Sequence, residues 1–597
     1  MQRLILICGV LLGMLNLSFS VCFTSNKTTG IVLVDETPMP EISEEQKSKG
    51  YVVFVRNYLD LVYPTSIPKK DELKTELVSF ATPGEFEPMT FSIRTLREIK
   101  GLKVIVSDLI NAKGQHIKKK NIDVRVVHCL NKILEHSTPC ILSIPAYLSL
   151  FDTIDIPPDI ATRFWLTIKI PPDQPAGIYQ GNINIVTSEA EPTTLNIRLQ
   201  VLPFKLLEPK DIAWGVYYIV QSKSASQIIR ELKDMREHGM TSVGLYSGPG
   251  KLFGERLGNY VSYNKEKVSL NLPDGSSRDS WFIWFVKAYK ELGFSEPICT
   301  IDEPAKFYVL SKYPLESDNF AVLYKSVMKA ITSEATRRGW PEIIWELVDE
   351  AQTDEQIAET KRLAKLHNEI KIPALITGWG RLMSEVGPYA NYLNYNGRLP
   401  NEEEILYAHQ NGKNVWYYNN DESGCQPEIM RYGAGFLLWK SKIDGMFNWE
   451  YGVANGSAYD DLDGRDFIAS YYPPEGHRTG GPTPGWEGFR EGVDDYKYLF
   501  TLSEVIKQAR NSMSQEVRTK TTKVEEQFHQ LMDTIYFHHD LRNSAHWRYK
   551  KSLPNGQEAF QGPLKIENGW DFESYQDARW RIAQFIMQLK DYMDQGQ

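Results

Sequence analysis

The sequence lacks the patterns of a metal-binding or disulfide-rich protein. Only 6 cysteines occur among 597 residues, and neither CxxC nor HExxH spacing is present. We therefore expect no structural zinc, no other metal and no cofactor. Cys129 and Cys140 flank a segment with a loop-like composition, which leaves both a disulfide and two buried thiols open.

The sequence also lacks long basic runs and, beyond its start, long apolar runs. Its net charge of -9 arises from 76 acidic and 67 basic residues, which argues against a nucleic-acid partner. No later stretch approaches the roughly 20 apolar residues that span a bilayer, so we expect no membrane span. The acidic loop at 460–466 resembles a calcium loop, but without the spaced glutamate of an EF-hand it is more typical of a surface turn.

The N-terminus is typical of a secretory signal. Residues 1–20 begin with a basic head and continue as an apolar run, and the small residues Ser18 and Ser20 suit cleavage after Ser20. We therefore expect export to the periplasm, the cell surface or the medium. A lipid anchor on Cys22 is disfavoured, because Val21 stands where such an anchor requires a small residue.

The pattern of apolar and polar residues changes near residue 205. Before this point, short alternating segments separated by Pro, Gly and Asp are typical of a β-sandwich, which we place at 30–205. Two prolines bracket residues 203–209, which we interpret as a stiff linker. The predicted strands of the sandwich are 51–56, 89–94, 102–106, 124–128, 164–170, 181–186 and 195–201.

Beyond the linker, strands alternate with amphipathic helices such as 225–238, 319–338 and 355–367, the pattern that produces parallel pairing. Eight such units predict a (β/α)8 barrel of the TIM type at 210–500. A helical C-terminal region is predicted at 501–597, so the expected fold class is multidomain, β plus α/β. The predicted barrel strands are 213–219, 241–246, 297–302, 343–348, 373–377, 392–395, 414–418 and 445–449.

Two adjacent acids, Asp349 and Glu350, end the fourth predicted barrel strand. Enzymes with this fold build their active sites at the C-terminal ends of the strands, so a carboxylate pair at this place predicts catalysis. In isolation, an Asp-Glu pair is more typical of a helix N-terminus. The catalytic interpretation therefore depends on the surrounding residues.

Aromatic and amide side chains collect at the ends of the later strands. Flat rings pack against sugar faces and amides bind hydroxyl groups, so together they predict a carbohydrate pocket and a glycan substrate, although any single ring is equally typical of a core. The predicted substrate-binding residues are Trp379, Asn394, Tyr395, Trp416, Tyr418, Trp449 and Glu450.

Three local patterns give the chain a resemblance to glycoside hydrolase family 123 over most of its length after the signal segment. They are PGEFEP at 83–88, IWELVDE at 344–350, and WEGFREGVDDY at 486–496, which follows YYPPEG at 471–476. The third pattern is expected to form a helix whose Arg490, Glu491 and Asp494 are structural, with an ion pair between Arg490 and Asp494.

The resemblance implies a β-N-acetylgalactosaminidase that uses its substrate's own 2-acetamido group as the nucleophile. It assigns the acid/base role to Glu350 and the orientation of the acetamido group to Asp349, and we expect Tyr395 to hold the acetamido carbonyl. Neighbouring residues of a strand point to opposite sides, so Asp349 and Glu350 can act together only if the strand has turned by Asp349.

Two departures leave alternatives open. Ala351 stands where family members commonly have proline, and a second acidic pair, Asp302-Glu303, ends the third predicted strand and is a competing candidate for the catalytic pair. One alternative is a conventional two-carboxylate retaining glycosidase for a 2-hydroxy sugar, with Glu450 or Glu422 as nucleophile. A glycan-binding barrel protein without catalysis is another. The sequence predicts neither the linkage cleaved nor the oligomeric state.

Overall fold

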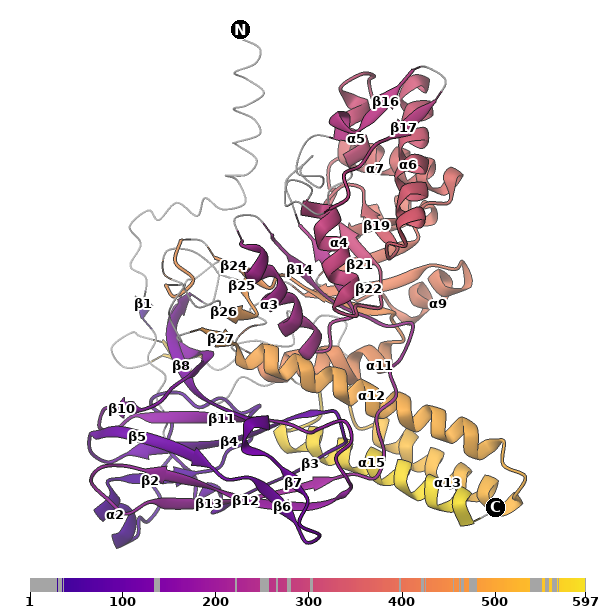
Figure 1. Ribbon diagram of the computed structural model, residues 1–597. Helices are drawn as coiled ribbons and strands as arrows, with labels where there is room; N and C mark the ends of the chain where they lie inside the picture. Colours follow the sequence, from indigo (N-terminus) through magenta and orange to yellow (C-terminus); the bar gives the residue numbers. More distant parts are fainter. Residues whose placement is uncertain are drawn as a thin grey trace.

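The computed structural model shows two β-sheets on one side, a strand barrel on the other, and long helices that pass between them (Figure 1). The structure describes residues 29–30, 35, 37–133, 140–220, 223–246, 257–264, 267–275, 281–300, 304–396, 399–419, 424, 426–454, 456–460, 462, 467–471, 480–536, 550–552, 558–560, 566 and 568–595. The signal-like segment 1–20, Cys22 and most of the acidic loop at 460–466 lie outside these ranges.

Two sheets make up the N-terminal part of the chain. One has the strand order β1-β9-β8-β11-β4-β2, and the other has the order β10-β5-β12-β13-β3 with β6 and β7 at its side. The bounds are β1 Thr29–Gly30, β2 Tyr51–Phe54, β3 Glu76–Ala81, β4 Phe86–Thr95, β5 Ile99–Val106, β6 Leu109–Asn111, β7 His116–Ile117, β8 Ile122–Ile133, β9 Cys140–Leu150, β10 Ile154–Ile156, β11 Ala161–Lys169, β12 Gly177–Val186 and β13 Thr193–Val201. The short helices are α2 Glu44–Lys49, η1 Lys70–Glu72 and η2 Lys119–Asn121.

Alternation of apolar and polar residues makes each sheet one-sided. In β13, for example, Leu195, Ile197 and Leu199 are buried while their neighbours are more exposed. These side chains share one hydrophobic cluster with Phe91 and Phe164 of the other sheet. Two sheets around a single core agree with the predicted sandwich.

The seven predicted strands of this region are present, and β1, β3, β6, β7, β9 and β10 were not predicted. Cys129 and Cys140 lie on the paired strands β8 and β9, and the segment 134–139 between these strands lies outside the described residues. The register places Cys129 opposite Pro145, several residues along the ladder from Cys140. That separation is too large for a disulfide between the two cysteines.

The second half of the chain forms a closed barrel of eight parallel strands, in chain order β14-β15-β18-β19-β20-β21-β22-β23. All eight predicted barrel strands are confirmed to within a few residues. The bounds are β14 Ala213–Tyr218, β15 Ser242–Leu245, β18 Ile298–Thr300, β19 Ile343–Glu346, β20 Ala374–Gly378, β21 Tyr392–Asn396, β22 Asn414–Asn419 and β23 Gly445–Asn448.

Helices lie between successive barrel strands, including the three that were predicted. Their bounds are α3 Ala225–Glu237, α4 Trp281–Glu291, α5 Pro304–Leu310, α6 Asp318–Arg338, α7 Asp354–Ile370, α8 Arg381–Val386, α9 Glu402–Gln410, α10 Pro427–Tyr432 and α11 Leu438–Ser441. The connections also contain η3 Leu257–Asn259, β16 Val261–Tyr263, β17 Val268–Leu270, η5 Gly387–Tyr389 and the π-helix η7 Gly433–Leu437.

Long helices follow the last barrel strand. They are α12 Pro484–Arg510, α13 Gln515–Met532 and α15 Phe572–Gln595, and the small strands of this part are β24 Gly452–Val453, β25 Phe467–Ile468, β26 Ser470–Tyr471, β27 Gly481–Pro482, β28 Lys550–Ser552 and β29 Glu558–Phe560. The predicted boundary at residue 500 therefore falls inside α12. None of the helices described here is both long and apolar enough to cross a bilayer.

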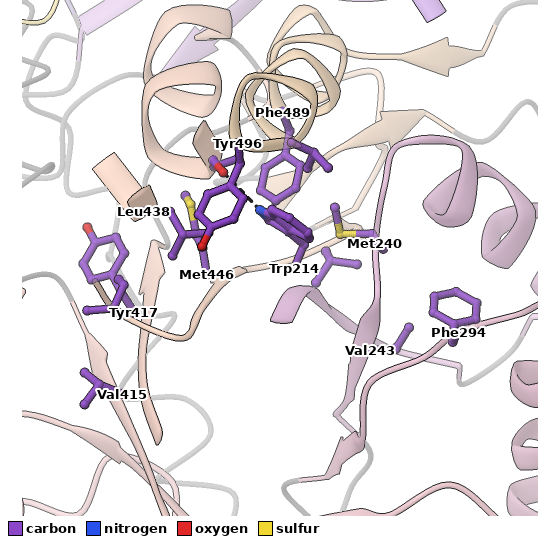
Figure 2. Packing of buried hydrophobic residues seen from close by; sticks show 14 of the residues in the cluster. Trp214, Met240, Val243, Phe294, Val415, Tyr417, Leu438, Met446, Phe489 and Tyr496 are labelled. Atoms are coloured by element: carbon purple, nitrogen blue, oxygen red, sulfur yellow. Dashed lines mark hydrogen bonds between the residues drawn. The ribbon is translucent and has the colours of Figure 1, made fainter. Parts of the chain in front are cut away.

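Helix α12 packs tightly against the barrel (Figure 2). The ring of Trp214, on β14, meets Tyr496 of α12 edge to face at 5.3 Å, and its Nε1 donates to the carbonyl of Ala434 at 3.0 Å. Gly488 allows this approach, because a Cβ atom there would lie 2.3 Å from the carbonyl oxygen of Pro427. Gly488, the first of the two glycines in the third sequence pattern, thus permits close contact between α12 and α10.

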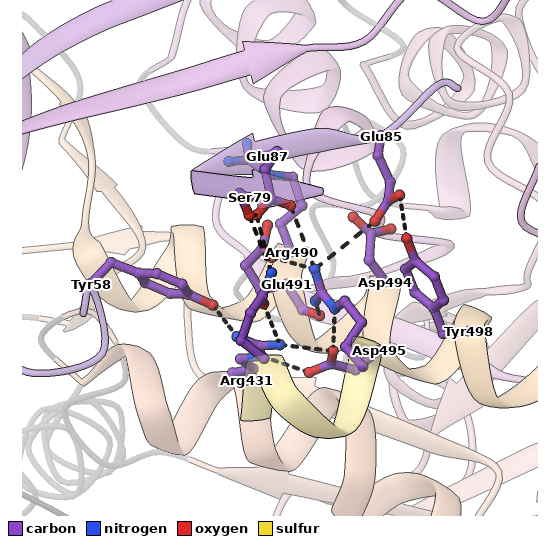
Figure 3. A network of polar contacts seen from close by, with 12 residues as sticks. Tyr58, Ser79, Glu85, Glu87, Arg431, Arg490, Glu491, Asp494, Asp495 and Tyr498 are labelled. Carbon is purple, nitrogen blue, oxygen red and sulfur yellow. Dashed lines mark hydrogen bonds and ion pairs between the residues drawn. The ribbon is translucent and has the colours of Figure 1, made fainter. Parts of the chain in front are cut away.

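The opposite side of α12 joins the sheets through a buried ionic network (Figure 3). Arg579 of α15 contacts Glu491 Oε2 at 2.7 Å and Asp495 Oδ1 at 2.5 Å, and it lies 3.7 Å from Glu87 Oε2 and 3.9 Å from Glu85 Oε1. The Asp495 carboxylate also binds Arg431, with Nε to Oδ2 at 2.6 Å. Two of the three sequence patterns, PGEFEP and WEGFREGVDDY, therefore meet in this network.

One predicted ion pair is wrong. Arg490 forms its ion pair with Glu487, three residues earlier, and not with Asp494. Glu487 also accepts from Thr167 of the sheet region at 3.2 Å and lies 3.2 Å from Nε2 of His238. The expected structural role of Arg490 and Glu491 agrees with these contacts, because both side chains are almost completely buried between elements.

Candidate active site

The Asp349-Glu350 pair lies in a turn at the C-terminal end of β19. The strand ends at Glu346, and Glu350 has a φ of 42°, in the left-handed region that non-glycine residues rarely adopt. The chain has therefore turned before the pair, which removes the geometric objection to the two acids acting together. Helix α7 is capped by Thr353, so neither acid serves as its N-cap.

Two barrel strands hold the carboxylate of Glu350. The amide Nδ2 of Asn396, on β21, and the hydroxyl of Tyr418, on β22, both donate to its Oε1. Gly378 at the end of β20 has a φ of 148°, and a Cβ atom there would lie 3.8 Å from the Cα of Glu350. Three neighbouring strands thus position the turn, and Glu350 remains partly exposed at the mouth of the barrel.

The carboxyl groups differ in their exposure. Asp349 is open to solvent at the mouth of the barrel, yet the surrounding protein raises its pKa through desolvation. Below it, Glu346 is fully buried, and this burial, with the nearby charges of Asp349 and Glu350, raises its pKa well above the usual value. Three acids with different exposure therefore lie at the end of β19: Glu350 is partly exposed, Asp349 is exposed and Glu346 is buried.

The structure separates the predicted residues of β21. Asn394 points into the barrel, where its Nδ2 donates to the hydroxyl of Tyr217 at 3.0 Å. Tyr395 packs against the outer hydrophobic cluster instead, on the opposite face of the strand from Asn394 and Asn396. Tyr395 therefore lies on the face of β21 that packs against the surrounding helices, while Asn394 and Asn396 share the other face.

The predicted tryptophans occupy three different environments. Trp416 is only 2% exposed and stacks on Phe447 at 4.7 Å in the barrel interior, so it forms part of the core. Trp449 is partly exposed and packs against Tyr217 in the same interior cluster. Trp379, which follows β20 directly, is 46% exposed and presents its ring to solvent.

Glu450 lies behind the barrel wall rather than in its mouth. It is 2% exposed, and its Oε1 accepts from the backbone N–H of Gly452 at 2.6 Å. Burial raises its pKa to about 8, and the charge of Lys223 partly opposes that shift. None of these contacts involves Glu350. Glu422, Asp302 and Glu303 lie outside the described residues.

Sequence reasoning overlooked Glu346 and the contact between Asn396 and Glu350. Glu346 is the one acid in the otherwise apolar strand β19, and alternation with the inward-facing Ile344 was an available signal for its position. Within the described residues, no group of three or more His, Cys, Asp or Glu side chains is arranged to hold a metal ion.

Two comparisons with known proteins point to the same group of enzymes. Residues 60–187 match the model of the glycoside hydrolase 123 N-terminal domain. The fold is similar to that of a family 123 glycoside hydrolase from Clostridium perfringens, with a TM-score of 0.61 and 13% identity over 92% of this chain and 99% of that one. The chain is related to glycoside hydrolase family 123. Together, the two similarities support glycosidase activity.

Two other solved structures have lower TM-scores against this chain. A family 39 glycoside hydrolase from Bacteroides cellulosilyticus WH2 has a TM-score of 0.34 and 13% identity over 70% of this chain and 81% of that one. A Bacteroides ovatus GH5 xyloglucanase has a TM-score of 0.28 and 9% identity over 71% and 99% of the two chains. Comparison with curated protein sequences gave no match.

Proposed function

We propose that the protein is an exported, retaining β-N-acetylgalactosaminidase or hexosaminidase that uses substrate-assisted catalysis on a (β/α)8 barrel. The observation that carries the proposal is the Asp349-Glu350 turn at the C-terminal end of β19, where Asn396 and Tyr418 fix the Glu350 carboxylate. Active sites of such barrels form at this end. Export rests on the signal-like sequence of residues 1–20.

Each acid has one task in this reaction. Glu350 protonates the glycosidic oxygen while the acetamido carbonyl oxygen of the substrate attacks C1 and the aglycone leaves. Asp349 accepts the acetamido N–H and stabilises the positive charge that develops on that nitrogen. Water, deprotonated by Glu350, then attacks C1 from the face that the aglycone left. The product has retained configuration, and Glu350 regains its proton.

Two side chains at the mouth suit substrate binding. Tyr418 replaces Tyr395 in our proposal as the hydroxyl beside the acetamido group, because it points into the barrel and touches Glu350. The exposed ring of Trp379 offers a flat apolar face to the sugar. The Clostridium perfringens enzyme acts in glycolipid glycan hydrolysis, and a glycolipid headgroup ending in an acetamido sugar is a suitable substrate class for this protein.

The conventional two-carboxylate mechanism receives less support. It requires carboxyl groups about 5 to 5.5 Å apart on opposite faces of the sugar. Glu450, one of its two candidate nucleophiles, is buried behind the barrel wall and bound to the backbone of Gly452.

The decisive experiment compares aryl β-N-acetylgalactosaminide with aryl β-galactoside. We expect the wild type to cleave only the acetamido sugar, a thiazoline analogue to inhibit it, and Glu350→Gln to lose at least about 100-fold in kcat/KM. Glu355→Gln, an exposed acid in the following helix α7, is the matched control and should retain activity. Cleavage of the 2-hydroxy sugar, or full activity of Glu350→Gln, would contradict the proposal.

A further inference from the structure

Tyr217 is a buried tyrosine in the middle of the barrel interior. It lies on β14, is 2% exposed, and belongs to the cluster of side chains that fills the barrel. Gly244 on the neighbouring strand β15 leaves room for its ring, because a Cβ atom there would lie 2.7 Å from Cδ1 of Tyr217. Its hydroxyl accepts from Nδ2 of Asn394, on β21, at 3.0 Å. The side chain is therefore fixed along its ring by β15 and at its hydroxyl by β21.

The ring of Tyr217 also contacts side chains near the mouth. It meets the ring of Tyr418, on β22, edge to face with the centroids 5.7 Å apart, and it lies 5.5 Å from the ring of Trp449, which directly follows β23. The hydroxyl of Tyr418 in turn donates to Glu350. Tyr217 is thus separated from the proposed acid/base by one intervening side chain.

Tyr418 has to keep one orientation for its hydroxyl to reach Glu350. Its ring contact in the described part of the chain is the one with Tyr217, and both rings are almost completely buried. In a densely packed interior, neighbouring side chains decide which rotamer a ring adopts. Without the ring of Tyr217, Tyr418 would have free space on its inner side and could turn away from Glu350.

We propose that Tyr217 is a positioning residue, whose ring holds Tyr418 in the rotamer that donates to Glu350. This inference rests on the proposed function, since it concerns the acid/base of that reaction. The role is indirect, because Tyr418 binds the carboxylate and Tyr217 fills the space beside Tyr418. The hydrogen bond from Asn394 fixes Tyr217 in its place. Strand β14 thereby supports the turn after β19, although the two strands are not neighbours in the barrel.

Tyr217→Phe and Tyr217→Leu separate the ring from its hydroxyl. Phenylalanine keeps the ring beside Tyr418, so its kcat should stay within about 3-fold of the wild type, although the loss of the buried acceptor for Asn394 should lower its Tm. Leucine removes the ring, and its kcat should fall about 10- to 100-fold with less than about 3-fold change in KM. Tyr417→Phe, on the outer side of β22 (Figure 2), is the matched control and should retain activity.

The pH profile of kcat/KM provides a readout that a loss of stability alone would not move. Glu350 must be protonated to act as the acid, so the alkaline limb of the profile reports its titration. The hydroxyl of Tyr418 favours the charged form, and its loss therefore raises the pKa of the Glu350 carboxyl group. The limb should move to higher pH by about 0.5 to 1 unit in Tyr217→Leu and Tyr418→Phe, and stay in place in Tyr217→Phe. All these variants keep the other acids of this strand end, Asp349 and Glu346.

Gly244→Ala keeps the inference testable if Tyr217→Leu fails to fold. It leaves every side chain of the site in place but forces the ring of Tyr217 to move, so it should shift the limb in the same direction. Adding Tyr418→Phe to either variant should leave the limb where Tyr418→Phe alone places it, because the two changes remove the same interaction.

The outcomes distinguish this inference from the proposed function. If the wild type cleaves acetamido sugars but the limb stays in place in Tyr217→Leu and Gly244→Ala, the role of Tyr217 is refuted and the proposed function stands. Additive shifts in the double variants would also refute it, because Tyr217 would then act independently of Tyr418. A wild type that cleaves only 2-hydroxy sugars would overturn the proposed function, while the limb on that substrate would still decide the role of Tyr217. A wild type inactive on all glycosides would overturn both.

Discussion

Replacement of Arg579 by methionine tests the buried network directly. Arg579 is 1% exposed, binds the carboxylates of Glu491 and Asp495, and lies within 3.9 Å of those of Glu85 and Glu87. Removing one partner of a buried ion pair typically costs about 3 to 5 kcal/mol, because the remaining charge stays desolvated. We expect a loss at the upper end of this range near neutral pH, since the carboxyl groups of Glu85, Glu87, Glu491 and Asp495 would lose their contact with Arg579 together.

The loss should depend on pH. Without Arg579, the pKa values of the remaining acids rise above their unfolded values, so the native variant binds more protons than the unfolded chain. Its stability then falls as pH increases, and the penalty relative to the wild type should be larger at pH 8 than at pH 5. A cavity or a lost packing contact would give a penalty that does not vary with pH.

Calorimetric and urea unfolding of Arg579→Met at both pH values provides the measurement. Arg581→Met, an exposed arginine on the same helix, is the matched control and should change the free energy of unfolding by less than about 0.5 kcal/mol. A penalty below about 1 kcal/mol for Arg579→Met, or one equal at both pH values, would refute the reasoning.

Three further predictions concern other parts of the molecule. Trp379→Ala should lower kcat/KM on a glycan substrate about 10-fold by removing an aromatic face worth roughly 1 to 2 kcal/mol, whereas Tyr407→Ala, an exposed ring on α9, should have no effect. Burial raises the pKa of Asp494 to about 8, so the native wild type holds a proton that the unfolded chain releases near 3.8. The Tm of Asp494→Asn minus that of the wild type should therefore grow from pH 5 to pH 8. A Tm difference that stays constant over this range would contradict the prediction. Gly488→Ala should lower the free energy of unfolding by about 1 to 3 kcal/mol in urea titrations, because its Cβ would lie 2.3 Å from the carbonyl oxygen of Pro427; wild-type stability would refute the close packing.

The barrel strands were predictable because each is a short, largely apolar run between helical segments, several of which begin at a capping residue such as Ser224, Ser317 or Thr353. It was harder to predict which side chains of a strand face the barrel interior. Asn394, Tyr395 and Asn396 are consecutive, and a shift of one residue reverses which side chains face the barrel interior. The sequence does not show that Tyr395 points outward, because its aromatic ring suits either face.

Contacts between distant segments account for most of what the sequence could not predict. Tyr418 reaches Glu350 only because closure of the barrel brings β22 beside the turn after β19, 68 residues away in the chain. The partner of Arg490 depended on rotamers within one helical turn, where both Glu487 and Asp494 were available. Trp416 was predicted as a pocket residue, but it lies in the middle of β22 and stacks on Phe447 in the barrel interior, deep in the core.

The ionic network between the sheets and α12 also limits how this protein can be divided. Glu85 and Glu87 belong to the segment that matches the N-terminal domain model, yet the cation beside them is Arg579, close to the other end of the chain. If the sheet region were produced alone, those two carboxyl groups would lie at a newly exposed surface without Arg579. The sheet region is therefore not an interchangeable module, and gene fusions or truncations that separate it from α15 should yield poorly folded protein.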